Sequence, residues 1–218
     1  MDTMPTRGGL LATTAPWGWR RLHRASAWLV GGFVALHLAN HLVAVFSLDA
    51  HVAVMAWLRH LYRAPLVEPL LLAAVAWQAG SGLWLVVRGW AVRRGRVAWL
   101  QAASGLGLAL FLLVHVSAVL WARGTGLDTN VYFAAMGLQA RASVAFFAPY
   151  YFGAVLALGV HGACAARRHA VVRPAGLVGG VAASALVGLA IVLSLAGAFA
   201  PVILPPAYRA VLLSWGLL

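Results

Sequence analysis

The chain has 218 residues, of which 63% are hydrophobic and only 9% are charged, and its mean hydropathy is +0.89. In a soluble domain roughly a quarter of the residues are charged, so this composition excludes an ordinary soluble fold and predicts an integral membrane protein. The net charge of +12 does not indicate nucleic-acid binding, because the basic residues, all of them arginine, stand in short clusters between long apolar segments.

The N-terminal part of the chain has one feature of a signal peptide, a group of arginines before an apolar segment. The apolar segment runs over 26–46, which is longer than the roughly 7–15 residues of a signal sequence, and no small-residue cleavage site follows it. We therefore expect it to remain as the first membrane span.

Five apolar segments reach the roughly 17–25 residues that a helix needs to cross a bilayer. In chain order the expected spans are 26–46, 66–88, 98–121, 148–166 and 175–199. Helices are expected because each backbone polar group in lipid must be satisfied within its own segment. The predicted fold class is an all-α integral membrane protein, with five transmembrane helices forming one domain over residues 1–218.

The arginines predict the orientation of this bundle. Eleven of them precede the first span or lie between the second and third and between the fourth and fifth spans: Arg7, Arg20, Arg21, Arg24, Arg88, Arg93, Arg94, Arg96, Arg167, Arg168 and Arg173. Five lie on the opposite side: Arg59, Arg63, Arg123, Arg141 and Arg209. The positive-inside rule places the N-terminus in the cytoplasm and the C-terminus outside. A bundle of four or six spans would break this asymmetry. We expect a multi-pass protein of a bacterial inner membrane.

Two patterns outside the histidines each have two interpretations. The outer segment 122–147 and the start of the fourth span are rich in aromatic residues, which indicates either a belt at the lipid headgroups or a lid or partner surface over the helix ends. The fifth span carries small residues four apart, which favours close packing within the chain or, alternatively, a homodimer seam. These small residues are Gly176, Gly180, Ser184 and Gly188.

Three expected spans carry histidine away from their ends: His37 and His41 in the first, His115 in the third and His161 in the fourth. Ionisable residues inside a membrane are rare and indicate function. Neutral imidazole binds iron, and two imidazoles on facing helices can hold a haem between them. Any one of these histidines could instead simply hydrogen-bond a neighbouring helix.

Depth in the membrane suggests which histidines pair. His37 or His41 can meet His115 toward the outside, whereas His161 lies in the inner half, without a histidine at its own level. The second-span residue at comparable depth is Gln78, a poor haem ligand. His41 and Asn40 are candidates for structural hydrogen bonds or for contact with a haem propionate or a quinone. His23, His51, His60 and His169 lie near interfaces or in loops and receive no role.

The segments "RLHRASAWLVGGFVALHLAN", "LQAASGLGLALFLLVHV" and "PYYFGAVLALGVHGAC" resemble the first, third and fourth helices of the cytochrome b membrane-anchor subunit of the dihaem succinate dehydrogenase and fumarate reductase family. The resemblance implies a distal haem b held by the positions of His37 and His115. It also implies a proximal haem held by the position of His161 together with a second-helix residue, which here is Gln78. This departure from the family indicates one haem rather than two.

The sequence therefore favours a membrane-embedded b-type cytochrome that passes electrons between a quinone and a partner, such as a cytoplasmic redox subunit, with His37 and His115 as axial ligands. With only four carboxylates in the chain, catalysis of hydrolysis or group transfer is not expected. The alternative is a haem-free structural or assembly subunit of a larger membrane complex, or a lipid-handling protein. A proton or ion carrier would need a line of intramembrane carboxylates, which Glu68 alone does not supply.

Overall fold

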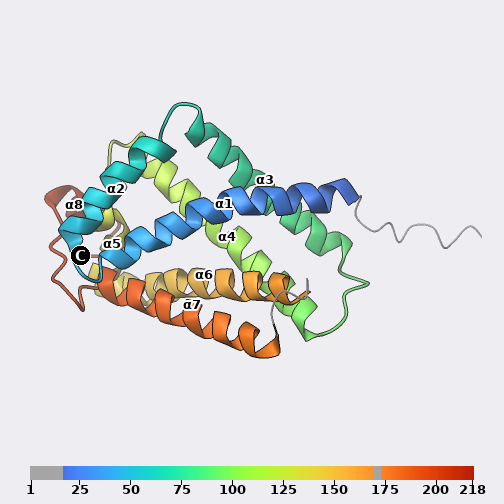
Figure 1. Ribbon diagram of the computed structural model, residues 1–218. Helices are drawn as coiled ribbons and strands as arrows, with labels where there is room; N and C mark the ends of the chain where they lie inside the picture. Colours follow the sequence, from blue (N-terminus) through green and yellow to red (C-terminus); the bar gives the residue numbers. More distant parts are fainter. Residues whose placement is uncertain (1–16, 169–172) are drawn as a thin grey trace, which may run out of the picture.

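The computed structural model describes residues 17–168 and 173–218, and every regular element in these ranges is an α-helix (Figure 1). Five helices are long and apolar enough to cross a membrane, as the sequence predicts. They are α1 (Trp17–Val43), α3 (Val67–Arg88), α4 (Arg96–Gly124), α6 (Arg141–Arg168) and α7 (Pro174–Leu195).

The helix ends differ most from the expected spans in α1, α6 and α7. Helix α1 begins at Trp17 rather than at 26, and its first turns pack on α3, where Trp19 stacks on Trp77 at a centroid distance of 5.0 Å. Helix α6 begins at Arg141 and contains Pro149. Helix α7 ends at Leu195 rather than at 199, because the chain turns at Gly197, whose φ of 85° lies in the left-handed region.

Three short helices that the sequence analysis did not predict lie together at the end of the bundle opposite to the start of α1 (Figure 1). They are α2 (Leu48–Tyr62), α5 (Val131–Gln139) and α8 (Pro206–Ser214). Side chains fix where the first two begin. The Ser47 hydroxyl accepts a hydrogen bond from the Ala50 amide at 3.1 Å, and the Asn130 side chain accepts one from the Tyr132 amide at 2.9 Å. We call this end of the molecule the capped end.

The main hydrophobic core lies under these short helices. Val131, Ala135 and Leu138 of α5 pack with residues of α6 and α7, and α8 packs against α5 through Tyr208 and Leu212. Polar links add to this packing, since Arg59 of α2 pairs with Asp128 at 2.9 Å. Segment 131–139 is therefore a lid over the helix ends, whereas Phe146 is 55% exposed, as belt residues are.

Backbone contacts between neighbours connect the five long helices in a ring. Helix α6 packs on α4 and α7, α3 packs on α1 and α4, and α1 closes the ring through a thin contact with α7. In the described part of the chain, α1 has no close backbone contact with α4 or α6, which face it across the centre. Contact between α1 and the two helices opposite to it is therefore made by side chains rather than by close backbone packing.

Small residues bring α6 and α7 together. A Cβ added at Gly159 of α6 would overlap the Ser184 side chain of α7, and one added at Gly188 would lie 3.3 Å from Val155. The small-residue face of α7 is thus used within the chain, which is the intramolecular interpretation of its pattern.

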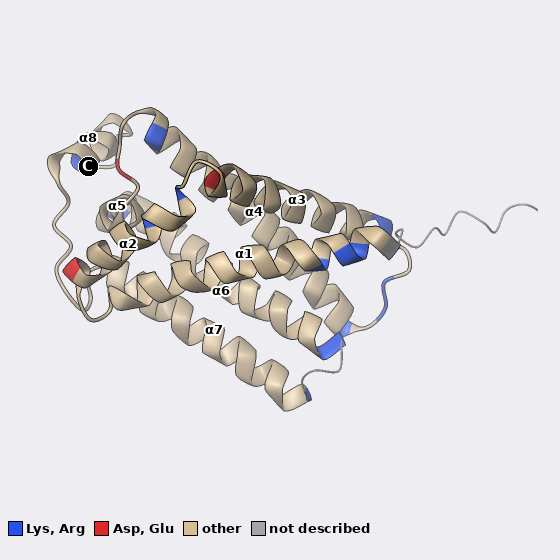
Figure 2. Ribbon diagram, turned by 45° about the horizontal axis from the view of Figure 1, so that its top comes forward, with Lys and Arg blue, Asp and Glu red and all other residues tan. Residues whose placement is uncertain are grey.

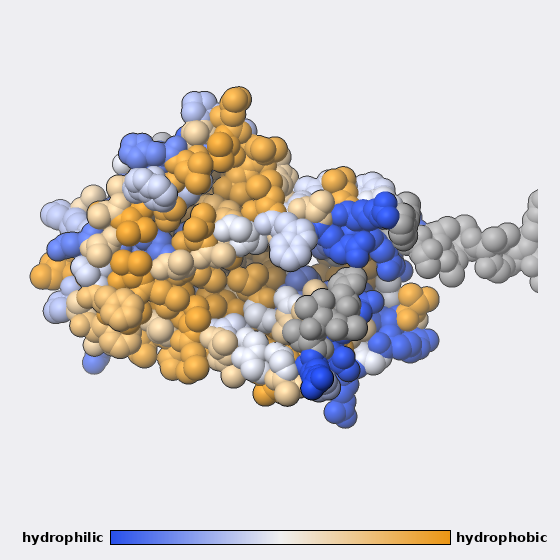
Figure 3. All heavy atoms as spheres, in the orientation of Figure 1, coloured by the Kyte–Doolittle hydropathy of each residue, from blue (hydrophilic) through white to orange (hydrophobic). Residues whose placement is uncertain are grey.

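The surface divides into three zones. Hydrophobic side chains cover the middle of the face seen in Figure 3. Large apolar side chains are strongly exposed, among them Trp28 at 84% and Leu66 at 86%. The arginines gather at the end where α1 begins (Figure 2), which we call the arginine-rich end. A broad apolar belt between two polar ends is the surface that a bilayer requires.

Candidate functional site

The ring centre near the capped end holds the first two of the predicted site residues. Helix α1 contributes His37 and α4 contributes His115, and the centroids of their imidazole rings lie 6.2 Å apart at an interplanar angle of 68°. Both side chains are half-buried. The two helices do not pack on each other here, so the imidazoles span the gap between them.

Aromatic residues one turn earlier orient both rings. Phe33 stacks on His37 at 5.7 Å, and Phe111 stacks on His115 at 5.0 Å. Residues four apart lie on the same helix face, so each phenylalanine restricts the rotation of its histidine. The F-x-x-x-H spacing occurs in both helices, and it is a signal that the sequence analysis did not use.

The separation of His37 and His115 fits a shared metal ion. An imidazole nitrogen binds a first-row metal at about 2 Å, so two rings that bind one iron from opposite sides have centroids on the order of 6 Å apart. The angle between the two rings is free, because each ring can rotate about its own bond to the metal. The two histidines could therefore serve as the axial ligands of a haem iron, as the sequence predicts.

His41 and Asn40 lie beside this pair. The His41 ring contacts the His37 ring edge to face, with centroids 4.7 Å apart. The His37 ring therefore contacts both the His41 ring and the His115 ring. Asn40 is 6% exposed, and its side-chain oxygen and the Nδ1 atom of His41 are both buried without a hydrogen-bond partner among the described residues. Unpaired buried polar atoms are costly. They mark a place where a further polar group would be held.

His51, to which the sequence analysis gave no role, completes what we call the capped-end histidine group: His37, His41, His51 and His115. It is only 1% exposed, and its ring lies 5.4 Å from that of His41. Its Nδ1 donates a hydrogen bond to the Asn40 carbonyl at 2.7 Å. Burial lowers the pKa of His51, the Asn40 carbonyl opposes this shift, and nearby Arg59 adds to it.

The sequence contained a signal for the position of His51. His51, Met55 and Leu58 share one face of α2 and are its buried residues, with the i, i+4, i+7 spacing of an amphipathic helix. A histidine on the apolar stripe of such a helix is expected to point inward.

Gln78 and His161 take part in two separate sets of hydrogen bonds, Gln78 between α1 and α3 and His161 between α4 and α6. His161 donates from Nδ1 to the Gln101 carbonyl of α4 at 3.0 Å, and the Ser104 hydroxyl lies 3.4 Å away. Ser104 thus contacts the His161 ring. Gln78 of α3 contacts α1, since its side-chain oxygen accepts from the Ser26 hydroxyl at 2.6 Å.

His23 of α1, which received no role from the sequence, lies beside Gln78 inside the bundle. The Gln78 amide nitrogen lies 3.1 Å from Nε2 of His23, and Nδ1 of His23 lies 2.7 Å from the Ser81 hydroxyl. The sequence analysis missed it because α1 begins earlier than expected, which places His23 inside the bundle rather than before it.

The structure offers no larger metal centre in the ranges it describes, since no three or more His, Cys, Asp or Glu side chains are placed to share an ion. A haem iron takes only two axial protein ligands. Among the described residues, a pair of histidines is therefore the arrangement that could bind a haem iron.

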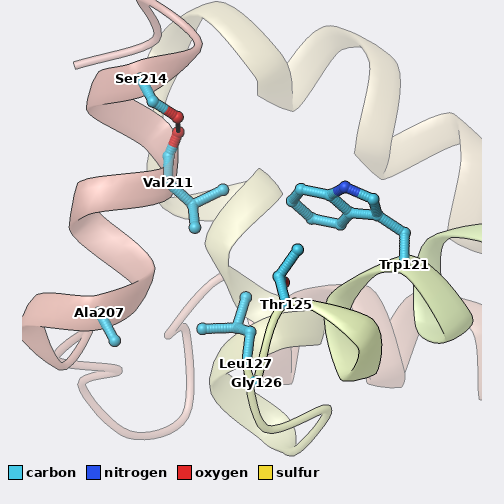
Figure 4. A pocket seen from close by; sticks show the side chains of 7 residues that line it. All are labelled: Trp121, Thr125, Gly126, Leu127, Ala207, Val211 and Ser214. Atoms are coloured by element: carbon cyan, nitrogen blue, oxygen red, sulfur yellow. Dashed lines mark hydrogen bonds between the residues drawn. The ribbon is translucent and has the colours of Figure 1, made fainter.

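A surface hollow of about 340 Å³ between α4 and α8 lies apart from the histidines (Figure 4). The Trp121 ring covers one side of it and Val211 the other, and the lining residues Leu127 and Ala207 are also apolar. It contains no charged side chain. The hollow is thus a mainly apolar seam between α4 and α8, with Thr125 and Ser214 as its hydroxyl-bearing residues.

No family model, curated protein or solved structure matches the chain.

Proposed function

We propose that the protein is a membrane-embedded b-type cytochrome with one haem b between His37 and His115. The observation that carries the proposal is the 6.2 Å separation of these two imidazoles across the gap between α1 and α4. When bound, the haem supplies one-electron chemistry. The resemblance of the first, third and fourth spans to the anchor subunits of succinate dehydrogenase and fumarate reductase supports the same proposal.

The chain's own residues would hold and tune this group. Phe33 and Phe111 fix the planes of the two ligating rings. His41 and Asn40 offer a buried nitrogen and a buried oxygen beside them, which suit a haem propionate or the head group of a quinone. Burial and such hydrogen bonds set the reduction potential. The protein would exchange electrons with a quinone and with a redox subunit docked at the arginine-rich end. The membrane would be a bacterial inner membrane.

The test is haem content in the purified protein. We expect haem b in the detergent-purified full chain, with the reduced-minus-oxidised spectrum of six-coordinate low-spin iron, and loss of that signal in His37→Ala and in His115→Ala. His60→Ala is the matched control, because His60 is exposed on α2 and should leave the spectrum unchanged.

A chain that carries no haem, although made in cells supplied with it, would overturn this proposal. It would leave the second candidate, a haem-free structural subunit of a larger complex. One observation favours that candidate: Gln78, Ser26 and His23 join α1 to α3 by side-chain hydrogen bonds, which hold helices together without any cofactor.

A further inference from the structure

The turn between α3 and α4, at the arginine-rich end, combines basic and aromatic side chains. We infer that it binds the phosphate group of an anionic phospholipid. The residues concerned, which we call the α3–α4 patch, are Trp90, Arg93, Arg94, Arg96 and Trp99. This inference concerns the lipid around the bundle and does not rest on the proposed function.

Arg93 orders the patch. Its guanidinium carbon lies 5.9 Å from the centre of the Trp90 ring and 5.1 Å from that of the Trp99 ring, and the two rings meet edge to face with centroids 4.9 Å apart. Its Nη2 atom donates to the Val86 carbonyl of α3 at 3.2 Å. A Cβ added at Gly89 would lie 3.2 Å from the same nitrogen, so a glycine there leaves room for it. Arg93 therefore holds both tryptophans and the end of α3 together as one surface.

Arg94 and Arg96 supply the groups that would contact a phosphate. Both side chains are exposed. Arg94 bends over the turn, because its Nη1 donates to the carbonyls of Ala91 at 3.1 Å and of Arg93 at 3.0 Å. Arg96 is the first residue of α4 and lies three positions before Trp99, so these two share a helix face. Both arginines thus belong to the surface that Arg93 orders, and a guanidinium group can bind two phosphate oxygens at once.

No side-chain carboxylate in the described chain balances the charge of the patch. Glu68 and Asp128 lie at the opposite ends of α3 and α4, and Asp49 lies on α2 (Figure 2). The Nη1 atom of Arg93 is buried without a hydrogen-bond partner among the described residues, which is costly for a charged group. An anion that complements the patch therefore comes from outside these residues.

Apolar side chains around the arginines favour a lipid as the source of that anion. The exposed apolar residues of this segment are Trp90, Val92, Trp99 and Leu100. Tryptophan is typical of the level at which acyl chains meet headgroups. A phosphate that is joined to acyl chains suits a surface with both guanidinium groups and exposed apolar side chains. The predicted orientation places this surface in the cytoplasmic leaflet, where anionic lipids attract basic segments.

Native mass spectrometry of the full chain in a neutral detergent tests the inference, with dioleoyl-phosphatidylglycerol and dioleoyl-phosphatidylcholine as probes. We expect the wild type to bind phosphatidylglycerol in preference to phosphatidylcholine. Because each arginine near an anionic lipid surface contributes about fivefold in affinity, the double variant Arg94→Gln with Arg96→Gln should bind phosphatidylglycerol about 25-fold more weakly. Size-exclusion elution and helix content in detergent would show that the variant is folded.

The matched control is Arg141→Gln with Arg209→Gln, which removes the same charge from two exposed positions at the capped end. It should bind phosphatidylglycerol as the wild type does. Equal weakening in the two double variants would show a response to net charge rather than a site, and would overturn the inference. A wild type without preference for phosphatidylglycerol would overturn it as well, and would leave the arginine-rich end to the redox subunit of the proposed function.

Hydrogen–deuterium exchange locates the bound lipid. Backbone amides of segment 89–99 should exchange more slowly in nanodiscs that contain phosphatidylglycerol than in nanodiscs of phosphatidylcholine alone. The variant with Arg94→Gln and Arg96→Gln should show no such difference. Arg93→Lys should also lose the protection although its charge is unchanged, because an ammonium group does not replace the planar guanidinium between the two rings. Protection confined to another segment would contradict the inference.

Discussion

Buried imidazoles in this protein are distinguished by what their Nδ1 atoms contact. His51 and His161 donate to backbone carbonyls, and His23 donates to a serine hydroxyl, whereas Nδ1 of His41 has no partner in the described chain. A hydrogen bond at one nitrogen fixes the tautomer and leaves the other nitrogen as an acceptor. The chemistry of each histidine thus follows from one neighbouring atom on another segment.

The lowered pKa of His51 should make the capped end sensitive to acid. The folded protein keeps this ring neutral, while the unfolded chain takes up a proton below its ordinary pKa of 6.5. The free energy of unfolding should therefore be highest above that value and fall as the pH drops toward the lowered pKa of the folded state. We expect a smaller loss in His51→Gln.

Thermal unfolding in detergent at about pH 7.5 and about pH 5.5 measures this dependence. His60→Gln, an exposed position on the same helix, is the control and should behave as the wild type does. An identical pH dependence in His51→Gln and wild type would show that His51 contributes nothing to it.

Helix packing in the bundle depends on the distribution of small residues. Gly159 lies against Ser184, and Gly180 lies against Ala163, so α6 and α7 approach more closely than larger side chains would allow. Only three residues away from Gly159, Gly162 has open space where a side chain would begin. The two glycines of one helix therefore have different structural roles.

Gly159→Ala should lower the free energy of unfolding by about 1–3 kcal/mol, because the new methyl group overlaps Ser184. Gly162→Ala is the matched control and should be neutral or slightly stabilising, since alanine favours helix. The double variant Gly159→Ala with Ser184→Gly should be more stable than the sum of the two single changes predicts. Additive effects in a thermal-unfolding cycle would contradict the contact.

The five spans could be predicted from the sequence, because continuous apolar segments of this length are typical of helices that cross a bilayer. The short helices were missed, since Ser47 and Asn130 are local start signals within segments that resemble loops. His37 and His115 could be singled out from the sequence because they lie well inside spans, and their role as ligands stays a prediction. The positions of His23 and His51 could not be predicted by counting depth from the ends of the spans. That count does not show that α1 begins at Trp17, before His23, or that α2, which carries His51, folds back over the bundle.

At the scale of the whole molecule, the two ends differ in charge and in construction. One end carries most of the arginines, and the other carries the short helices α2, α5 and α8 together with the ion-paired residues Glu68 and Asp128 (Figure 2). Among the charged residues there, Arg59 pairs with Asp128 and Arg123 with Glu68. Ion pairs reduce the net charge of the capped end, which increases the contrast between the two ends.

This contrast predicts that the arginine-rich end faces the cytoplasm. Alkaline phosphatase fused after Leu218 should be active, because the C-terminus would lie outside, and green fluorescent protein fused there should be dark. The same reporters inserted after Gly95, between α3 and α4, should give the opposite result. The reverse pattern at both positions would show an inverted protein.

The sparse backbone contact of α1 with the helices across the ring has a consequence for how the protein is made in the cell. Helix α1 has no close backbone contact with α4 or α6 in the described part of the chain, so on the proposed function the haem supplies contacts that these helices lack. A newly inserted chain would remain loosely assembled until haem arrives, and membrane proteases act on such chains. The amount of protein should then follow the haem supply even at constant synthesis, which makes cofactor delivery the step that determines its lifetime.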